Sequence, residues 1–74
     1  MTPSHTLSVL DVVALLEDVP DQGLVRGQVG TVVEELTPGV FEVELSDDDG
    51  RTYAELALPA GDLLVLHHRR VQAA

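Results

Sequence analysis

Cysteine is absent from this sequence, and so is lysine, and each absence removes a class of function. Without cysteine the chain has no disulfide framework, no thiolate-ligated zinc site and no thiol nucleophile, which favours a reducing, intracellular compartment. The chain also lacks a secretory signal, and no apolar run approaches the roughly 18–20 residues that span a bilayer. We therefore expect a cytoplasmic protein.

Aromatic residues are also scarce, at 3% of the 74 residues. A chain of this length forms a single domain with a small core. That core must be built from Val, Leu and Ala around Phe41 and Tyr53, which we expect to be structural residues. Two aromatic side chains cannot line the groove with which SH3 domains bind proline-rich peptides.

Positive charge is the third shortage, because thirteen Asp and Glu residues stand against four Arg and give a net charge of −9. Such a charge repels the phosphates of nucleic acids and of anionic membranes, so neither is an expected partner. The expected partner is another protein, with a basic surface. The alternative is that the acidic residues only keep a small domain soluble.

Apolar and β-branched runs separated by turn residues predict an all-β protein. The expected strands are Asp11–Leu16, Gly30–Leu36, Val40–Leu45, Arg51–Leu58 and Leu63–Leu66. Residues 17–28 hold Pro20, Gly23 and Gly27 and are expected to form a long loop. Five short strands in an open sheet would leave long exposed edges, which favours a closed barrel.

The segment Val40–Leu45 has the clearest strand pattern, because apolar and acidic residues alternate along it. This alternation places Phe41, Val43 and Leu45 in the core and leaves Glu42 and Glu44 in water. For Arg51–Leu58 the pattern does not decide whether Ala54, Leu56 and Leu58 or their neighbours point inward.

Four glycines are expected to be structural, since they stand where the chain turns or bends: Gly27, Gly30, Gly39 and Gly50. Thr37-Pro38-Gly39 is typical of a hairpin turn, with Pro fixing one central position and Gly supplying positive φ at the next. Asp49-Gly50 ends a second turn, because both residues tolerate left-handed backbone. Residues 59–62 predict a short 3₁₀ turn before the last strand.

These elements together predict a five-stranded SH3-like barrel over residues 8–67, with flexible tails at residues 1–7 and 68–74. Leu10–Pro20, Gly23–Glu34, Val40–Leu45, Asp49–Ala54 and Leu58–Leu63 closely resemble a family of short bacterial proteins known only as a domain of unknown function. The sequence R-G-Q-V-G-T-V-V, from residue 26, is similar to the start of other SH3-like barrels, among them KOW modules. That second resemblance implies an accessory role within larger assemblies.

No motif points to catalysis, to a cofactor or to a complete metal site. Gly27 and Gly30 lead into a strand without the Lys-Ser/Thr that a phosphate loop needs. Asp47–Asp49 offers the oxygen ligands that calcium prefers, but the twelfth position of that loop is Leu58 rather than Glu. His67 and His68, as strand neighbours, would point to opposite sides. The acidic residues lie in turns or on solvent-facing strand positions, so we expect none of their pKa values to be shifted.

The sequence therefore favours a non-catalytic, acidic protein-interaction module that is a monomer or a small homo-oligomer. It would act as an antitoxin- or immunity-like protein or as an accessory subunit of an assembly. The alternative is a regulator that binds a small ligand or a metal at the acidic turn of residues 47–50. The candidate partner-binding residues are Asp47, Asp48, Asp49, Glu42 and Glu44.

Overall fold

The computed structural model describes residues 7–66, which form five β-strands and two short 3₁₀ helices. The strands are β1 (Val12–Leu15), β2 (Val29–Thr37), β3 (Val40–Ser46), β4 (Thr52–Pro59) and β5 (Leu63–Val65). The 3₁₀ helices are η1 (Pro20–Gln22) and η2 (Ala60–Asp62). The expected tails, with His67 and His68, lie outside the described residues apart from Leu7, which is buried.

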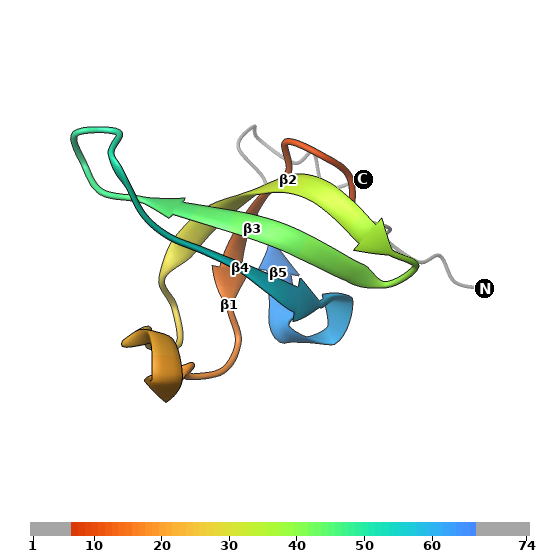
Figure 1. Cartoon of the computed structure of the whole chain (residues 1–74), viewed down its shortest axis with the longest axis horizontal. Helices are drawn as coiled ribbons and strands as arrows, with labels where there is room; N and C mark the ends of the chain where they lie inside the picture. The colour runs from red at the N-terminus through yellow and green to blue at the C-terminus, as the bar shows by residue number, and fades with distance from the viewer. Residues whose placement is uncertain (1–6, 67–74) are drawn as a thin grey trace, which may run out of the picture.

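All five strands belong to one antiparallel sheet, in the order β4-β3-β2-β1-β5. The long strands β2 and β3 run across the molecule, and η2 carries the chain from β4 round to β5 (Figure 1). The predicted all-β fold and the 3₁₀ turn before the last strand are therefore confirmed. The expected closure of a barrel is not found, because no ladder among residues 7–66 joins β4 to β5.

The alternation along β3 produces one buried and one solvent-facing side of the sheet. Phe41, Val43 and Leu45 are buried, whereas Glu42 and Glu44 are partly exposed. The expected orientation of β3 is confirmed. A shift of one residue would have buried both carboxylates and exposed the apolar set, so the hydrophobic pattern fixes the register.

The orientation of β4 follows from its register with β3. Residues that lie opposite each other in a ladder share a face, and Val43 lies opposite Leu56 while Phe41 lies opposite Leu58. Leu56 and Leu58 therefore point inward with Ala54. Tyr53 is the extra residue at a register shift between β3 and β4, where the regular alternation of sides is interrupted. Tyr53 remains 48% exposed, so its expected place in the core is wrong.

Gly30 lies where the packing of β2 on β3 leaves no room for a side chain. It lies opposite Leu45, and a Cβ built on it would stand 2.8 Å from the carbonyl oxygen of Glu44 and 2.8 Å from a methyl group of Val43. Any side chain here would push the two strands apart, because real Cβ atoms do not come so close to backbone oxygens. Glycine is therefore needed at position 30 because no side chain fits there, and not because the backbone has a positive φ.

The other three glycines expected to be structural have left-handed backbone. Gly39 (φ 85°) and Gly50 (φ 83°) both have left-handed backbone, which glycine adopts without steric cost. The residues that precede them, Pro38 and Asp49, do not have positive φ. Gly27 (φ 96°) ends the loop after β1, and that loop contains η1, which the sequence reading treated as irregular.

Candidate functional site

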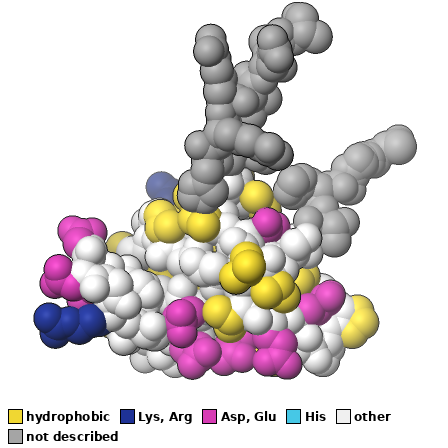
Figure 2. Space-filling model, turned by 90° about the horizontal axis from the view of Figure 1, so that it is seen from above, with side chains coloured by type: hydrophobic (Ala, Val, Ile, Leu, Met, Phe, Trp, Pro, Cys, Tyr) yellow, Lys and Arg dark blue, Asp and Glu magenta, His cyan; other side chains and the backbone are white. Residues whose placement is uncertain are grey.

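Four glutamates from three neighbouring strands lie on the outer side of the sheet, and we call this group the acidic face. The ladders place Glu34 of β2 opposite Glu42 of β3, and Glu44 of β3 opposite Glu55 of β4. Directly opposite residues have Cβ atoms about 4.5–5.5 Å apart and project to the same side. Figure 2 shows Asp and Glu side chains gathered in one continuous group on this side of the molecule.

A β-bulge brings Glu34 into this group. The register of β2 and β3 shifts between Val32 and Glu34, so that Val33 is an extra residue in β2. Without the extra residue, Val33 would lie opposite Glu42 and Glu34 would follow on the inner side of the strand. The bulge therefore exchanges a valine for a carboxylate at the position opposite Glu42.

The neighbouring carboxyl groups change the titration of one member of the acidic face. The pKa of Glu42 is raised above its ordinary value of 4.5, first by a hydrogen bond with the carboxyl group of Glu55 and next by partial burial. Repulsion from Glu55, Glu34 and Glu44 raises it further. The expectation that no acidic residue has a shifted pKa is therefore wrong, because it ignored neighbours on other strands.

No arginine within residues 7–66 forms an ion pair with the acidic face. The ion pair found in that part of the chain joins Arg51 to Asp49 at 4.0 Å, in the turn between β3 and β4. Like charges directly opposite each other in a sheet destabilise it. The acidic face therefore lowers the stability of the fold that carries it.

Exposed apolar side chains lie beside the acidic face. Val29 of β2 and Leu64 of β5 both pair with Ala14 of β1 and so share its outer side, and each is about half exposed. Tyr53 of β4 is also about half exposed and accepts a hydrogen bond from Gln28 Nε2 at 3.1 Å. Exposed aliphatic side chains beside charged residues offer the apolar area that the centre of a protein interface buries.

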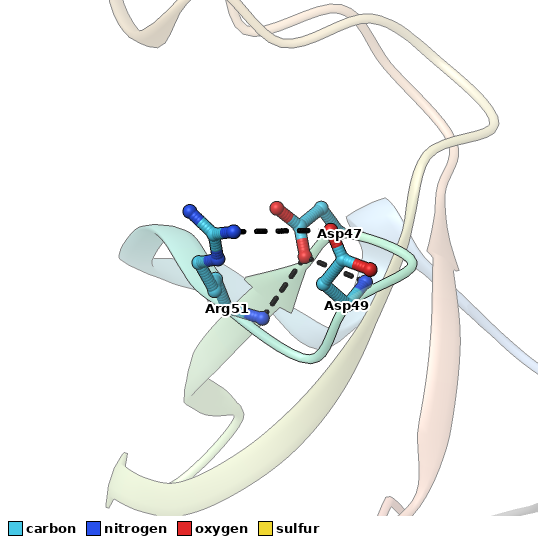
Figure 3. A network of polar contacts seen from close by, with 3 residues as sticks. All are labelled: Asp47, Asp49 and Arg51. Atoms are coloured by element: carbon cyan, nitrogen blue, oxygen red, sulfur yellow. Dashed lines mark hydrogen bonds and ion pairs between the residues drawn. The ribbon is translucent and has the colours of Figure 1, made fainter.

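The acidic turn of residues 47–50 has a different organisation (Figure 3). Asp47 Oδ1 accepts hydrogen bonds from the backbone N–H groups of Asp49 at 2.9 Å and Arg51 at 3.0 Å. The Asp47 carbonyl accepts another from the Gly50 N–H at 2.9 Å. These bonds close a three-residue hairpin loop in which Gly50 supplies the left-handed position. The Asp47 side chain thus holds the backbone of the turn.

Metal binding at this turn would need several free carboxylate oxygens directed at one point. Among residues 7–66 no three His, Asp or Glu side chains are grouped so that they could hold one ion. The same part of the chain also has no helix long and apolar enough to cross a membrane.

The five candidate residues from the sequence thus fall into two groups. Glu42 and Glu44 lie on the acidic face, whereas Asp47, Asp48 and Asp49 lie in the turn at the end of the same hairpin. The sequence reading missed Glu34 and Glu55. Counting back across the three-residue turn, from Asp47 opposite Arg51, would place Glu55 opposite Val43 on the inner side. A register shift at Tyr53 moves Glu55 opposite Glu44 instead, and the sequence marks neither this shift nor the bulge at Val33.

These observations define a small antiparallel β-domain with one acidic, partly apolar sheet face. The chain belongs to the family described as Domain of unknown function (DUF4926), which it matches over residues 9–65. The resemblance to a family without an assigned function is therefore confirmed. Neither the curated proteins nor the solved structures include a match to this chain.

Proposed function

We propose that this protein is a non-catalytic interaction module that binds a basic surface of another protein through its acidic face. The observation that supports this proposal most strongly is the convergence of Glu34, Glu42, Glu44 and Glu55 from three strands. Their mutual repulsion opposes folding, so the fold does not explain why they lie together. Binding to Lys and Arg side chains would relieve the repulsion and give each carboxylate a partner.

The exposed residues beside the acidic face support the same proposal. Val29 and Leu64 offer apolar area that a partner could cover, while the glutamates would select its charge. Two roles suit such a module: an antitoxin- or immunity-like neutraliser of a basic protein, and an accessory subunit of a larger assembly. We place it in the cytoplasm because the chain has no cysteine.

Capture experiments from the native host would test the proposal. The wild-type protein would be immobilised beside a face variant, in which Glu34, Glu42, Glu44 and Glu55 are all Gln, and captured proteins identified by mass spectrometry. A turn variant with Asp47, Asp48 and Asp49 replaced by Asn is the matched control, since it also loses several negative charges. We expect a basic partner that the wild type and the turn variant retain and the face variant loses.

The purified partner would then allow a kinetic test. Charge-steered association slows steeply as salt rises, because the Debye length falls from about 10 Å at 0.1 M to about 3 Å at 1 M. We expect this dependence for the wild type and the turn variant, and a much flatter one for the face variant. Equal capture by the face variant, together with salt-independent association rates, would contradict the proposal and leave solubility as the role of the charge.

A further inference from the structure

The outer edge of the sheet at β4 is open, which is unusual for a strand of this length. β4 has eight residues and pairs with β3 on one side, while no strand within residues 7–66 pairs with its other side. Natural proteins protect such edges with lysines, prolines, bulges or very short strands. β4 has no lysine, its proline is the last residue, and its one register shift lies at its first residues, near Ser46. Its central part, Ala54–Leu58, therefore has none of these four protections, and its one charged side chain is Glu55.

The ladder determines which backbone groups of β4 point away from β3. The Ala60 N–H donates to the Gly39 carbonyl oxygen at 2.9 Å, immediately before Val40 and Pro59 lie opposite each other. Bonded and non-bonded pairs alternate in an antiparallel ladder, so the pairs of Leu58 and Leu56 with β3 are bonded ones. The N–H and C=O groups of Glu55 and Ala57 consequently point out from the edge. Both residues are exposed.

The edge and the acidic face meet at Glu55. A strand added beside β4 would continue the sheet, and every second side chain of that strand would stand next to Glu55 and Ala57 on the outer side. Glu42 and Glu44 lie on β3, one strand further in, within reach of long side chains. The other side chains of the added strand would stand next to Leu56 and Leu58 on the apolar side.

We propose that β4 binds an extended segment of the partner as a sixth strand, with Lys or Arg alternating with aliphatic residues along that segment. The proposal rests on the proposed function and names how the partner is recognised. Backbone hydrogen bonds to Glu55 and Ala57 supply affinity, and the acidic face selects basic residues at alternate positions. A second copy of this chain fits the edge less well, because antiparallel pairing of two β4 strands would bring two acidic faces together on one sheet surface.

A synthetic peptide with Lys and Val in strict alternation is the probe for this site. We expect the full-length protein to bind it, and the Glu55 and Ala57 amides to become protected from hydrogen exchange when it is bound. A peptide of the same composition with the order scrambled tests the alternation, and one with N-methyl groups on alternate residues tests the backbone bonds. Each should bind at least about tenfold more weakly, the effect of losing one or two hydrogen bonds.

Ala57→Pro tests the edge from the side of the protein. Proline removes an N–H that points away from β3, so the ladder survives and the variant should fold, as prolines on edge strands do. Ala57→Ser keeps the N–H and is the matched control. We expect A57P to weaken binding of the alternating peptide at least about tenfold and A57S to leave it unchanged. If A57P does not fold, the N-methylated peptides decide the question on the wild-type protein.

The possible results separate this proposal from the proposed function. Absence of binding by the alternating peptide, equal binding of its N-methylated form, or unchanged exchange at Glu55 and Ala57 would each overturn strand addition. If the natural partner is lost by the face variant but retained by A57P, the acidic face binds the partner without the edge. A protein that sediments as a dimer, and as a monomer after A57P, would show that a second copy occupies the edge.

Discussion

The two groups of acidic residues in this chain differ in what their carboxylates contact. In the turn, Asp47 accepts two backbone N–H groups and Asp49 pairs with Arg51. On the acidic face, glutamates lie opposite glutamates, and the pKa of Glu42 rises because of its neighbours. The contacts of Asp47 and Asp49 stabilise the turn, whereas repulsion among the glutamates of the acidic face destabilises the sheet. In the amino-acid composition, all of these residues count equally toward the net charge of −9.

The largest expected effect comes from comparing the two sides of β3. Val43 is fully buried between Val32 and Leu56, so Val43→Ala removes packed methyl groups and leaves a cavity, at a cost of about 2 kcal/mol. Glu44→Gln, at the next position, should change the stability by less than about 0.5 kcal/mol. Urea unfolding of both variants measures this. A loss for E44Q that matches V43A would mean that the acidic face stabilises the fold.

A smaller loss should follow from removing the carboxylate that holds the turn. Asp47→Ala leaves two backbone N–H groups without their acceptor and should cost about 1 kcal/mol, as the loss of a helix N-cap does. Asp47→Asn keeps an acceptor oxygen and should lose less.

Asp48→Ala is the matched control for the turn, since it removes the same side chain one residue further on. Asp48 is exposed and makes no side-chain hydrogen bond within residues 7–66, so its loss should change the stability by less than about 0.5 kcal/mol. Thermal and urea unfolding of the two alanine variants compare them. Equal unfolding midpoints for the two alanine variants would show that the Asp47 carboxylate does not stabilise the turn.

The sequence was sufficient for most of the fold because the hydrophobic pattern and the turn residues agree. Alternation in Val40–Leu45 orients β3, and Gly39 and Gly50 mark the two hairpin turns, so all five strands lie within about two residues of their expected bounds. Tyr53 was misplaced because its size suggested burial. It is the extra residue at a register shift between β3 and β4, and such a shift is a property of two strands rather than of one.

The acidic face was harder to predict than the fold. Glu42 and Glu44 could be placed in water from their own strand, but their neighbours come from pairing across strands. Glu34 joins them because of the bulge at Val33, and bulges have no reliable local sequence signal when glycine is absent. Barrel closure was expected from the cost of free edges. Among residues 7–66 the outer edge of β4 stays unpaired, so the cost of a free edge alone did not predict the architecture.

A pH-dependent effect should distinguish Glu42 from the other acidic residues. Because its pKa is raised in the folded state, its stabilising contribution is fully present below the unfolded value of 4.5 and is lost as pH rises through the folded pKa. Glu42→Gln is neutral at every pH, so it should melt at a higher temperature than the wild type at about pH 7. The difference should disappear at about pH 3.5, where the wild-type carboxyl is protonated in both states.

Glu17→Gln is the control for this experiment, because Glu17 is exposed in the loop after β1 and lies outside the acidic face. Its melting temperature should follow that of the wild type at both pH values. A gain in E17Q as large as that in E42Q would mean that net charge, rather than crowding on the face, sets the effect.

The smallest expected effect is the response of stability to salt, and it compares the two acidic groups at equal net charge. Sodium chloride screens repulsion between exposed carboxylates, so it should raise the melting temperature of the wild type. E42Q and Asp48→Asn each remove one negative charge, the first from the acidic face and the second from the turn. E42Q should respond less to salt than the wild type because the most crowded carboxylate is gone, whereas D48N should keep the wild-type response.

Thermal melts of the three proteins from about 0.01 M to about 1 M salt make the measurement, with Debye lengths of about 30 Å and 3 Å at the limits. Equal responses of E42Q and D48N would show that repulsion is spread over the whole surface and that the four glutamates form no distinct group.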